Sequence, residues 1–357
     1  MKRIFLSALA AAMLAVPMFA GSAHAAKSFN GISFQSEYFE RHPTTVKVFK
    51  PFFAAAKEQF QGKLSFDYFT QGALFPPAEA FSAVSDGRVD FGNIRPSRFP
   101  GKLNLLGVCD IPGMCPNSIV GSLVAFDLIQ KFEEIRREMP ANTVTFTTWA
   151  SAPYQLHSSK PIRSLADIKS LKCVVWDAPT MEVMKKFGAN PIRLDSHDTY
   201  LALSKGMAEA VLCPLAPVRS IKITDICTNH YIMDLGTSNF IELANKDVWE
   251  AFPADMRAWL EAQGGRKMAL DAALSLDGGA QADARWMKEQ GHTFVTMTPE
   301  DRAAMIAALQ PLADEWVAAT SKIFPAELVK AVFDYARERS AFYQKEVASG
   351  KYGDFSL

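Results

Sequence analysis

The chain has 357 residues, more than one hydrophobic core usually holds, so we expect two α/β lobes. Lysine plus arginine and aspartate plus glutamate each total 38, and this zero net charge argues against a nucleic-acid-binding protein, which needs a positive field to attract phosphates. With 49% hydrophobic and 21% charged residues, the composition is that of a folded protein rather than a disordered one.

The N-terminal segment has the pattern of a secretory signal peptide. Lys2 and Arg3 precede an apolar run at residues 4–20, and small residues dominate positions 21–25. The run is shorter than a membrane-spanning helix needs, and no basic stop-transfer segment follows it. We therefore expect a signal peptide at residues 1–25, and a mature chain in the periplasm with 36 basic and 38 acidic residues.

Residues 31–94 alternate between strand and helix patterns. Periodicity and turn residues predict strands at 31–35, 64–69 and 89–94 and helices at 44–59 and 78–85. Because this alternation is typical of parallel strands joined by helices, we expect a parallel sheet.

The alternation continues from residue 117, where helical periodicity extends to residue 137. Ser164 and Asp167 have the spacing of a capping box, and a second lobe is expected to begin near Ser151. The further predicted elements are strands at 143–149, 171–176, 191–194 and 210–213 and helices at 180–187 and 198–205.

Residues 247–290 form helix-favouring sequence of unusual length, weakened only by the glycine pairs at 264–265 and 278–279. We expect this helix to run along both lobes and a helical tail to follow at 299–343. The predicted first lobe comprises residues 26–150 and about 237–276, and the second comprises 151–236 and about 277–357.

Motifs of common enzyme and metal sites are absent from the sequence. It has no nucleophile elbow, phosphate-binding loop, dinucleotide fingerprint or zinc-protease motif, so we predict no catalysis, no cofactor and no metal. Asp195, His197 and Asp177 are the remaining candidates for acid/base chemistry. For Asp195 and Ser196 we favour the simpler role of capping the helix that follows.

The five cysteines are too few for a disulfide scaffold. Cys109 and Cys115 flank a turn and can pair in an oxidising compartment, but spacing does not fix their Cα separation, so both states stay open. Cys173, Cys213 and Cys227 are expected to be buried apolar residues.

Four segments, in this order, carry a family resemblance. They are the first helix with QGKLSF (61–66), GALFPPAE (72–79), AVSDGRVDFG (83–92), and KPIRSLADIKSLK (160–172) followed by FGANP (187–191), YLALSKG (200–206) and Pro214. Together they resemble the extracytoplasmic solute receptors of tripartite ATP-independent periplasmic (TRAP) transporters, the family of the C4-dicarboxylate receptor. The similarity covers nearly the whole mature chain.

The resemblance implies a two-lobe α/β periplasmic binding protein with crossing strands and a long helix spanning both lobes. Such a receptor captures a small organic solute between the lobes and delivers it to the membrane permease subunits of a TRAP transporter. Two alternatives remain at this point: a secreted enzyme on a similar scaffold that uses Asp195, His197 or Asp177, and the receptor of an ATP-driven importer.

Two positions depart from the family pattern. The family usually has an arginine, which grips a solute carboxylate, two residues after the lysine of the Leu-Lys segment, but this chain has Val174 there. Cys213 replaces the family's asparagine just before Pro214. The resemblance therefore does not supply the usual carboxylate clamp.

Arg95 and Trp176 are our leading candidates for solute binding, because each follows a predicted strand at the end where open α/β sheets bind ligands. Arg95 can hold an anion, and the Trp176 ring can stack on a flat solute. The complete set of predicted ligand-binding residues is Arg95, Trp176, Cys213, Tyr154, Trp149, Val174, Gln71 and Tyr38.

These residues also predict a ligand class. Val174, Cys213 and Trp176 lower the polarity of one wall, so we expect a solute with an apolar or aromatic part in preference to a small C4-dicarboxylate.

Overall fold

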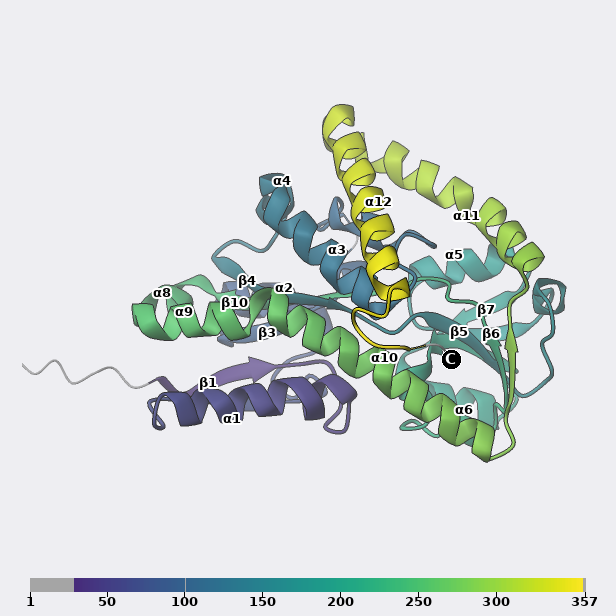
Figure 1. Ribbon diagram of the computed structural model, residues 1–357, viewed down its shortest axis with the longest axis horizontal. Coiled ribbons are helices and arrows are strands. Elements are labelled where there is room, and N and C mark those ends of the chain that lie inside the picture. The colour runs from purple at the N-terminus through teal and green to yellow at the C-terminus, as the bar shows by residue number, and fades with distance from the viewer. Residues whose placement is uncertain (1–28, 100, 356–357) are drawn as a thin grey trace, which may run out of the picture.

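Two mixed β-sheets form the two lobes of the chain (Figure 1). The structure is a computed structural model that describes residues 29–99 and 101–355, so the predicted signal peptide lies outside the described residues. Three segments discussed below connect the lobes: residues 151–153, residues 233–238 and a long helix.

The first lobe contains a five-stranded sheet with the order β2-β1-β3-β10-β4. Its strands are β1 (Phe29–Gln35), β2 (Leu64–Phe69), β3 (Phe91–Ile94), β4 (Thr143–Ala150) and β10 (Asn239–Asn245). β1 pairs in parallel with β2 and β3, whereas β10 pairs antiparallel with β3 and β4. The expected parallel sheet is thus present only in part. The antiparallel strand β10 is buried along its whole length and lacks the alternation by which a strand is recognised.

The second lobe contains a six-stranded sheet with the order β11-β9-β5-β8-β6-β7. Its strands are β5 (Tyr154–Ser158), β6 (Lys172–Val175), β7 (Asn190–Arg193), β8 (Ala210–Pro214), β9 (Asn229–Ile232) and β11 (Thr293–Thr296). β5 runs antiparallel to both of its neighbours, β8 and β9, while β6 is parallel to β7 and β8. The sequence pattern missed β5, β9 and β11.

Helices cover both faces of the first sheet. A π-helical turn (Thr45–Phe49) and α1 (Lys50–Gln59) share one core with α9 and α10, and α2 (Ala80–Ser85) and α3 (Ser118–Lys131) pack on the other face. The Asn117 side chain caps α3 by accepting the Val120 N–H. The expected helix at 117–137 breaks at Phe132, after which α4 (Glu133–Arg137) begins.

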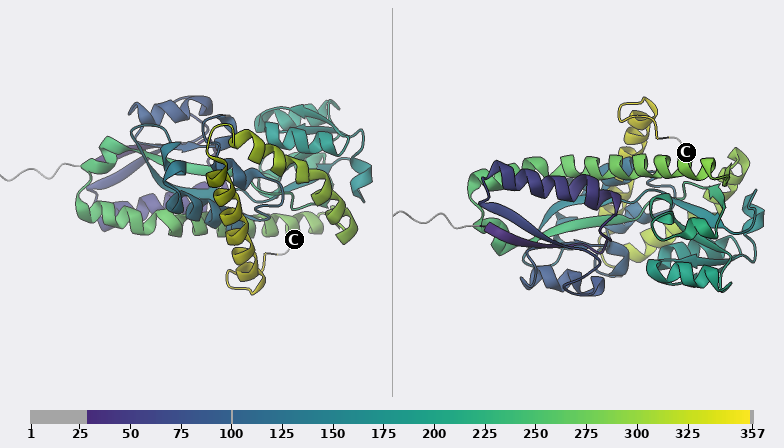
Figure 2. Two further views of the ribbon diagram at one scale, coloured as in Figure 1. Left: turned by 90° about the horizontal axis from the view of Figure 1, so that it is seen from above. Right: turned by 90° about the horizontal axis from the view of Figure 1, so that it is seen from below.

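The long helical segment predicted at 247–290 is three helices: α8 (Lys246–Ala251), α9 (Ala254–Gln263) and α10 (Gly265–Glu289). The break between α9 and α10 needs a small residue, because a Cβ at Gly264 would lie 2.3 Å from the Phe146 ring. α10 then runs along both lobes, contacting α3 and β4 in the first and α7 (Leu215–Val218) in the second (Figure 2).

The chain ends in α11 (Pro299–Thr320) and α12 (Ala326–Ala348), which separate at Phe324–Pro325. Val329, Val332, Ala336 and Tyr343 of α12 belong to the core that contains α3. α12 therefore lies on the first lobe, and our assignment of residues 277–357 to the second lobe is wrong for this helix. The remaining helices, α5 (Ala178–Lys186) and α6 (Thr199–Ser204), belong to the second lobe.

All five cysteines are buried and are free thiols in this structure. Cys109 and Cys115 lie in the same core cluster, and a hydrogen bond from Cys115 together with burial raises the pKa of the Cys109 thiol. The two side chains are therefore neighbours that form no disulfide in this structure.

Candidate functional site

The site lies between the lobes, where the segments that follow β1, β3 and β6 meet. A cavity of about 670 Å³ there adjoins a second one of about 910 Å³, and both are lined by Arg95, Arg98, Trp176 and Asp195. These volumes are in the range of small-molecule sites. The carboxyl ends of parallel strands β1 and β3 lie at the same edge of the sheet, which brings their following residues together.

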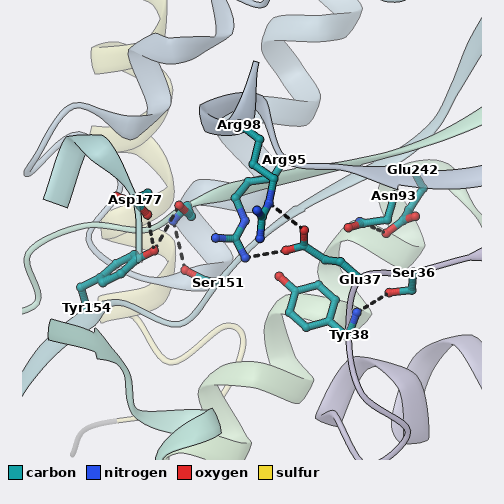
Figure 3. A network of polar contacts seen from close by, with 11 residues as sticks. Ser36, Glu37, Tyr38, Asn93, Arg95, Arg98, Ser151, Tyr154, Asp177 and Glu242 are labelled. Atoms are coloured by element: carbon teal, nitrogen blue, oxygen red, sulfur yellow. Dashed lines mark hydrogen bonds and ion pairs between the residues drawn. The ribbon is translucent and has the colours of Figure 1, made fainter. Parts of the chain in front are cut away.

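Two arginines and one glutamate form the charged centre of this cleft (Figure 3). Glu37, which follows β1, accepts from Arg95 Nη2 at 2.5 Å and from Arg98 Nε at 3.1 Å. The Arg95 and Glu37 side chains are only 11% and 7% exposed. Burial opposes the charge of Arg95, but Glu37 together with the nearby Tyr38, Tyr154 and Asp177 outweighs this effect and raises the pKa of Arg95 above its ordinary value. The three side chains together carry one net positive charge.

Arg95 has binding capacity left after this pairing. Its Nε is buried and has no hydrogen-bond partner among the residues that the structure describes. Its guanidinium also lies 4.9 Å from the centre of the Phe240 ring. An anion entering the cleft therefore finds a fixed cation with an unused N–H donor.

Aromatic rings form one wall of the same cavity. Trp149 stacks on Phe240 with ring centroids 4.4 Å apart, and Tyr38 lies 5.2 Å from each. Trp149 Nε1 donates to the buried Glu242 at 2.9 Å, which fixes the orientation of the indole. Burial raises the pKa of Glu242 to about 7, although hydrogen bonds from Trp149 and Asn93 act in the opposite direction.

The second lobe contributes Tyr154 and Trp176. The Tyr154 hydroxyl donates to Asp177 at 3.0 Å, and Asp177 also accepts from the backbone N–H of Thr180, so this carboxylate caps α5. Trp176 Nε1 donates to Thr199 Oγ1 at 3.0 Å. Both rings are held in place by neighbours, which suits them for packing against a solute.

Asp110 lines the adjoining cavity, where its Oδ1 accepts from Asn239 Nδ2 at 3.2 Å. Burial raises the pKa of Asp110 to about 7, with the Asn239 hydrogen bond opposing the shift. At neutral pH this carboxyl is thus about half protonated, which reduces the negative charge that it adds to the cleft.

Six of the eight predicted ligand-binding residues line the 670 Å³ cavity: Arg95, Trp176, Tyr154, Trp149, Gln71 and Tyr38. Val174 and Cys213 line neither cavity. Both have no exposed surface and belong to one hydrophobic core, because β6 and β8 lie side by side in a sheet that is covered on both faces. The prediction that these two residues face a solute is wrong, whereas a binding role for the other six stays a prediction.

Sequence reasoning did not select three residues that line this cavity. For Glu37, which follows the first strand, the sequence leaves an acidic contact to the solute and a solvated loop as equal alternatives. Phe240 lies on the unrecognised strand β10, and His42 gave no signal beyond its place after β1. Only the spatial pairing of Glu37 with Arg95 shows what it does.

The residues considered for acid/base catalysis do not form a catalytic group. His197 lies on the surface, with its side chain 77% exposed and 3.6 Å from Asp198. Asp195 occupies the cap position of a short helical turn but makes no side-chain capping bond. Within the described residues no cluster of three or more histidine, cysteine or acidic side chains is arranged to hold a metal ion.

Three histidines of the second lobe form a hydrogen-bonded chain. His157 Nε2 is 3.1 Å from the Cys213 carbonyl, His157 Nδ1 is 2.8 Å from His230 Nδ1, and His230 Nε2 is 2.9 Å from His292 Nδ1. Burial lowers the pKa of His157 to about 4 and that of His230 to about 2. The inner two rings are therefore neutral at neutral pH.

No helix within residues 29–99 and 101–355 combines the length and apolar character that a membrane span requires.

Comparison with known proteins places these features in a family context. The family model described as bacterial extracellular solute-binding protein, family 7 (DctP), matches residues 35–320. The C4-dicarboxylate-binding periplasmic protein DctP of Rhodobacter capsulatus is 23% identical over 266 residues, which cover 73% of this chain and 78% of that protein.

Solved structures share the fold. A TRAP solute-binding protein from Rhodoferax ferrireducens T118, in complex with copurified benzoate, superposes with a TM-score of 0.80 at 19% identity, covering 89% of this chain and 99% of that one. A marine metagenome TRAP solute-binding protein in complex with 3-hydroxybenzoate gives a TM-score of 0.80 at 19% identity, covering 88% and 99%. These structures confirm the predicted two-lobe α/β fold class.

Proposed function

Because this chain belongs to family 7 of the bacterial extracellular solute-binding proteins, we propose that it binds a monocarboxylate with an aromatic or otherwise apolar body. The chain is a solute receptor of the TRAP type and not an enzyme. The proposal concerns which solute the cleft accepts.

The charge of the Arg95, Arg98 and Glu37 group carries the proposal. Glu37 neutralises one of the two guanidinium groups, so one positive charge is left for a solute. A monocarboxylate balances that charge. A dicarboxylate brings a second carboxylate for which this group has no second uncompensated cation, and an unpaired desolvated charge is costly. Arg41, the other arginine of this lining, is exposed to solvent.

The aromatic lining supports an apolar body. Trp149, Phe240, Tyr38, Tyr154 and Trp176 all line the cavity that contains Arg95. Flat rings of this kind gain from burying a flat apolar solute and from stacking on it. This support replaces the argument from Val174 and Cys213, which lie in the core.

The names and bound ligands of the relatives indicate two different solute classes. The Rhodobacter capsulatus protein is named for C4-dicarboxylates, whereas the Rhodoferax ferrireducens and metagenome proteins were solved with benzoate and 3-hydroxybenzoate. The charge balance of this cleft favours the second group.

Two further parts of the proposal follow from the family. The receptor acts in the periplasm after removal of residues 1–25, and it delivers its solute to the membrane permease subunits of a TRAP transporter.

A thermal-shift comparison of benzoate with succinate tests the proposed ligand class. Binding to the folded state raises the melting midpoint, and a solute at about 100 times its Kd adds about 2.7 kcal/mol of stability. We expect a clear rise with benzoate and little change with succinate at the same concentration and ionic strength. A rise with succinate equal to or larger than that with benzoate would refute the monocarboxylate assignment.

A further inference from the structure

His42 is a buried polar residue of the cleft that the charged centre does not use. The residue is only 4% exposed, and it lines the cavity that contains Arg95. The imidazole lies among aromatic rings, with its centroid 4.0 Å from that of Tyr38, 5.3 Å from Phe39 and 6.2 Å from Trp149.

The hydrogen bonds of His42 fix which ring nitrogen carries the proton. The backbone N–H of Thr44 donates to His42 Nδ1 at 3.4 Å, and Thr44 Oγ1 lies 2.7 Å from the same nitrogen. A backbone N–H can only donate, so Nδ1 is an acceptor and carries no hydrogen. Burial lowers the pKa of His42 to about 3, so the ring is neutral and its single proton is on Nε2.

The Nε2–H donor has no partner anywhere in the described part of the chain. Nε2 is not one of the fully enclosed unpaired atoms of the described residues, so it keeps accessible surface although the residue as a whole is buried. Because His42 lines the cavity, a solute there can accept this hydrogen bond in place of water. Capping of the following helix accounts for the hydrogen bond that Nδ1 accepts, but it provides no acceptor for the Nε2–H group.

We propose that His42 Nε2–H donates a hydrogen bond to the bound solute and selects an aromatic acid that carries a hydroxyl or carbonyl oxygen in addition to its carboxylate. The inference deepens the proposed function and rests on it. Tyr38 lies between the two binding points. Its ring packs on His42, and its hydroxyl lies on the side of the Arg95 guanidinium, whose positive charge lowers the pKa of Tyr38 although burial raises it overall (Figure 3). A solute whose carboxylate binds Arg95 therefore reaches His42 across the width of about one ring.

The chemistry of a neutral imidazole determines the preference. An uncharged N–H pairs well with an uncharged oxygen acceptor, and it offers no full charge to balance a second carboxylate. His42 thus distinguishes among monocarboxylates, whereas Arg95 and Glu37 set the total charge.

Two variants separate the solute donor from the helix cap. In His42→Asn, the amide oxygen takes the place of Nδ1 and keeps an acceptor for Thr44, but the shorter side chain lacks the Nε2 donor. In His42→Gln, the amide N–H₂ reaches the position of Nε2. Melting curves of both solute-free variants verify that they fold.

Isothermal titration calorimetry of the purified full chain compares benzoate with 2-, 3- and 4-hydroxybenzoate. For the wild type we expect the best-placed hydroxyl to tighten binding about three- to tenfold over benzoate, as one neutral hydrogen bond does. His42→Asn should abolish this gain, measured as the ratio of hydroxybenzoate affinity to benzoate affinity within the same variant, and His42→Gln should retain part of it.

An equal hydroxyl gain in wild type and His42→Asn would overturn the inference, as would an equal loss for benzoate and its hydroxylated forms. If neither benzoate nor any hydroxybenzoate binds the wild type, the proposed function itself fails. That result is distinct from a wild type that binds benzoate without preferring a hydroxyl.

Discussion

Replacing Arg95 by alanine should weaken both solute binding and the folded state. Arg95 supplies a charge-assisted hydrogen bond to the solute carboxylate, which is worth about 1.5–3 kcal/mol, so we expect benzoate to bind about 10- to 150-fold more weakly. The same substitution removes the 2.5 Å partner of Glu37, whose side chain is only 7% exposed.

The loss of stability can be estimated from the same contacts. Breaking a buried ion pair by removing one partner costs about 3–5 kcal/mol, because the other charge stays buried. Glu37 keeps Arg98 at 3.1 Å, so we expect the lower end of that range. For a chain of this size, each 1 kcal/mol lowers the melting midpoint by roughly 2–4 °C.

A double variant separates the two effects. In Glu37→Gln/Arg95→Ala the buried Glu37 charge, which keeps only Arg98 as a partner in the single variant, is gone, so part of the lost stability should return, while benzoate binding should stay weak. Arg98→Ala is the matched control, because its side chain is 35% exposed and its loss should change stability little. Calorimetric titration and chemical denaturation measure the two quantities. Equal stabilities of the single and double variants, or unchanged benzoate affinity in Arg95→Ala, would refute this reasoning.

Two further predictions concern other parts of the lobes. Trp176→Ala should weaken the binding of aromatic acids by about 1–3 kcal/mol in titrations, while Trp176→Phe should keep most of the affinity, because the ring supplies buried apolar area. Equal effects of both changes would contradict a stacking role. His157 is neutral in the folded state, whereas in the unfolded chain it protonates below about pH 6.5. The folded state therefore loses stability as the pH decreases from 6.5 toward about 4, by about 2 kcal/mol at pH 5. A buried carboxyl with a raised pKa, such as Glu242, makes the folded state more stable as the pH falls and so masks this effect. The free energy of unfolding in urea is therefore compared between the wild type and His157→Gln, at pH 7 and at pH 5. The stability advantage of the wild type should shrink at pH 5, and a constant or widening difference would argue against a neutral buried His157.

The sequence predicted the location of a residue correctly where that location depends only on the residue's position along its own strand. Arg95 and Trp176 follow β3 and β6, and the carboxyl ends of parallel strands lie at one edge of a sheet, so both could be placed near the cleft. The capping box of Ser164 and Asp167 is likewise a local pattern, and it is present in the structure.

The sequence was uninformative where partners come from distant segments. Val174 matches a ligand position of the family pattern, yet residues 173–175 are all fully buried, because both faces of that sheet are covered. Glu242 contradicts the pattern of a buried strand, and only Asn93 and Trp149, brought together by the sheet, explain how β10 accommodates it.

The paired connections between the lobes limit the ways in which the cleft can change shape. Residues 151–153 and 233–238 run side by side, joined by hydrogen bonds from Ser151 N to the Ser238 carbonyl and from Tyr154 N to the Gly236 carbonyl, at 2.8 and 2.9 Å. α10 forms a third attachment along the flank of both lobes (Figure 2). Sliding or twisting of one lobe against the other would break these bonds, whereas rotation about an axis along the paired segments keeps them. A single distance between two probes, one on each lobe, should therefore report the whole opening coordinate of this receptor.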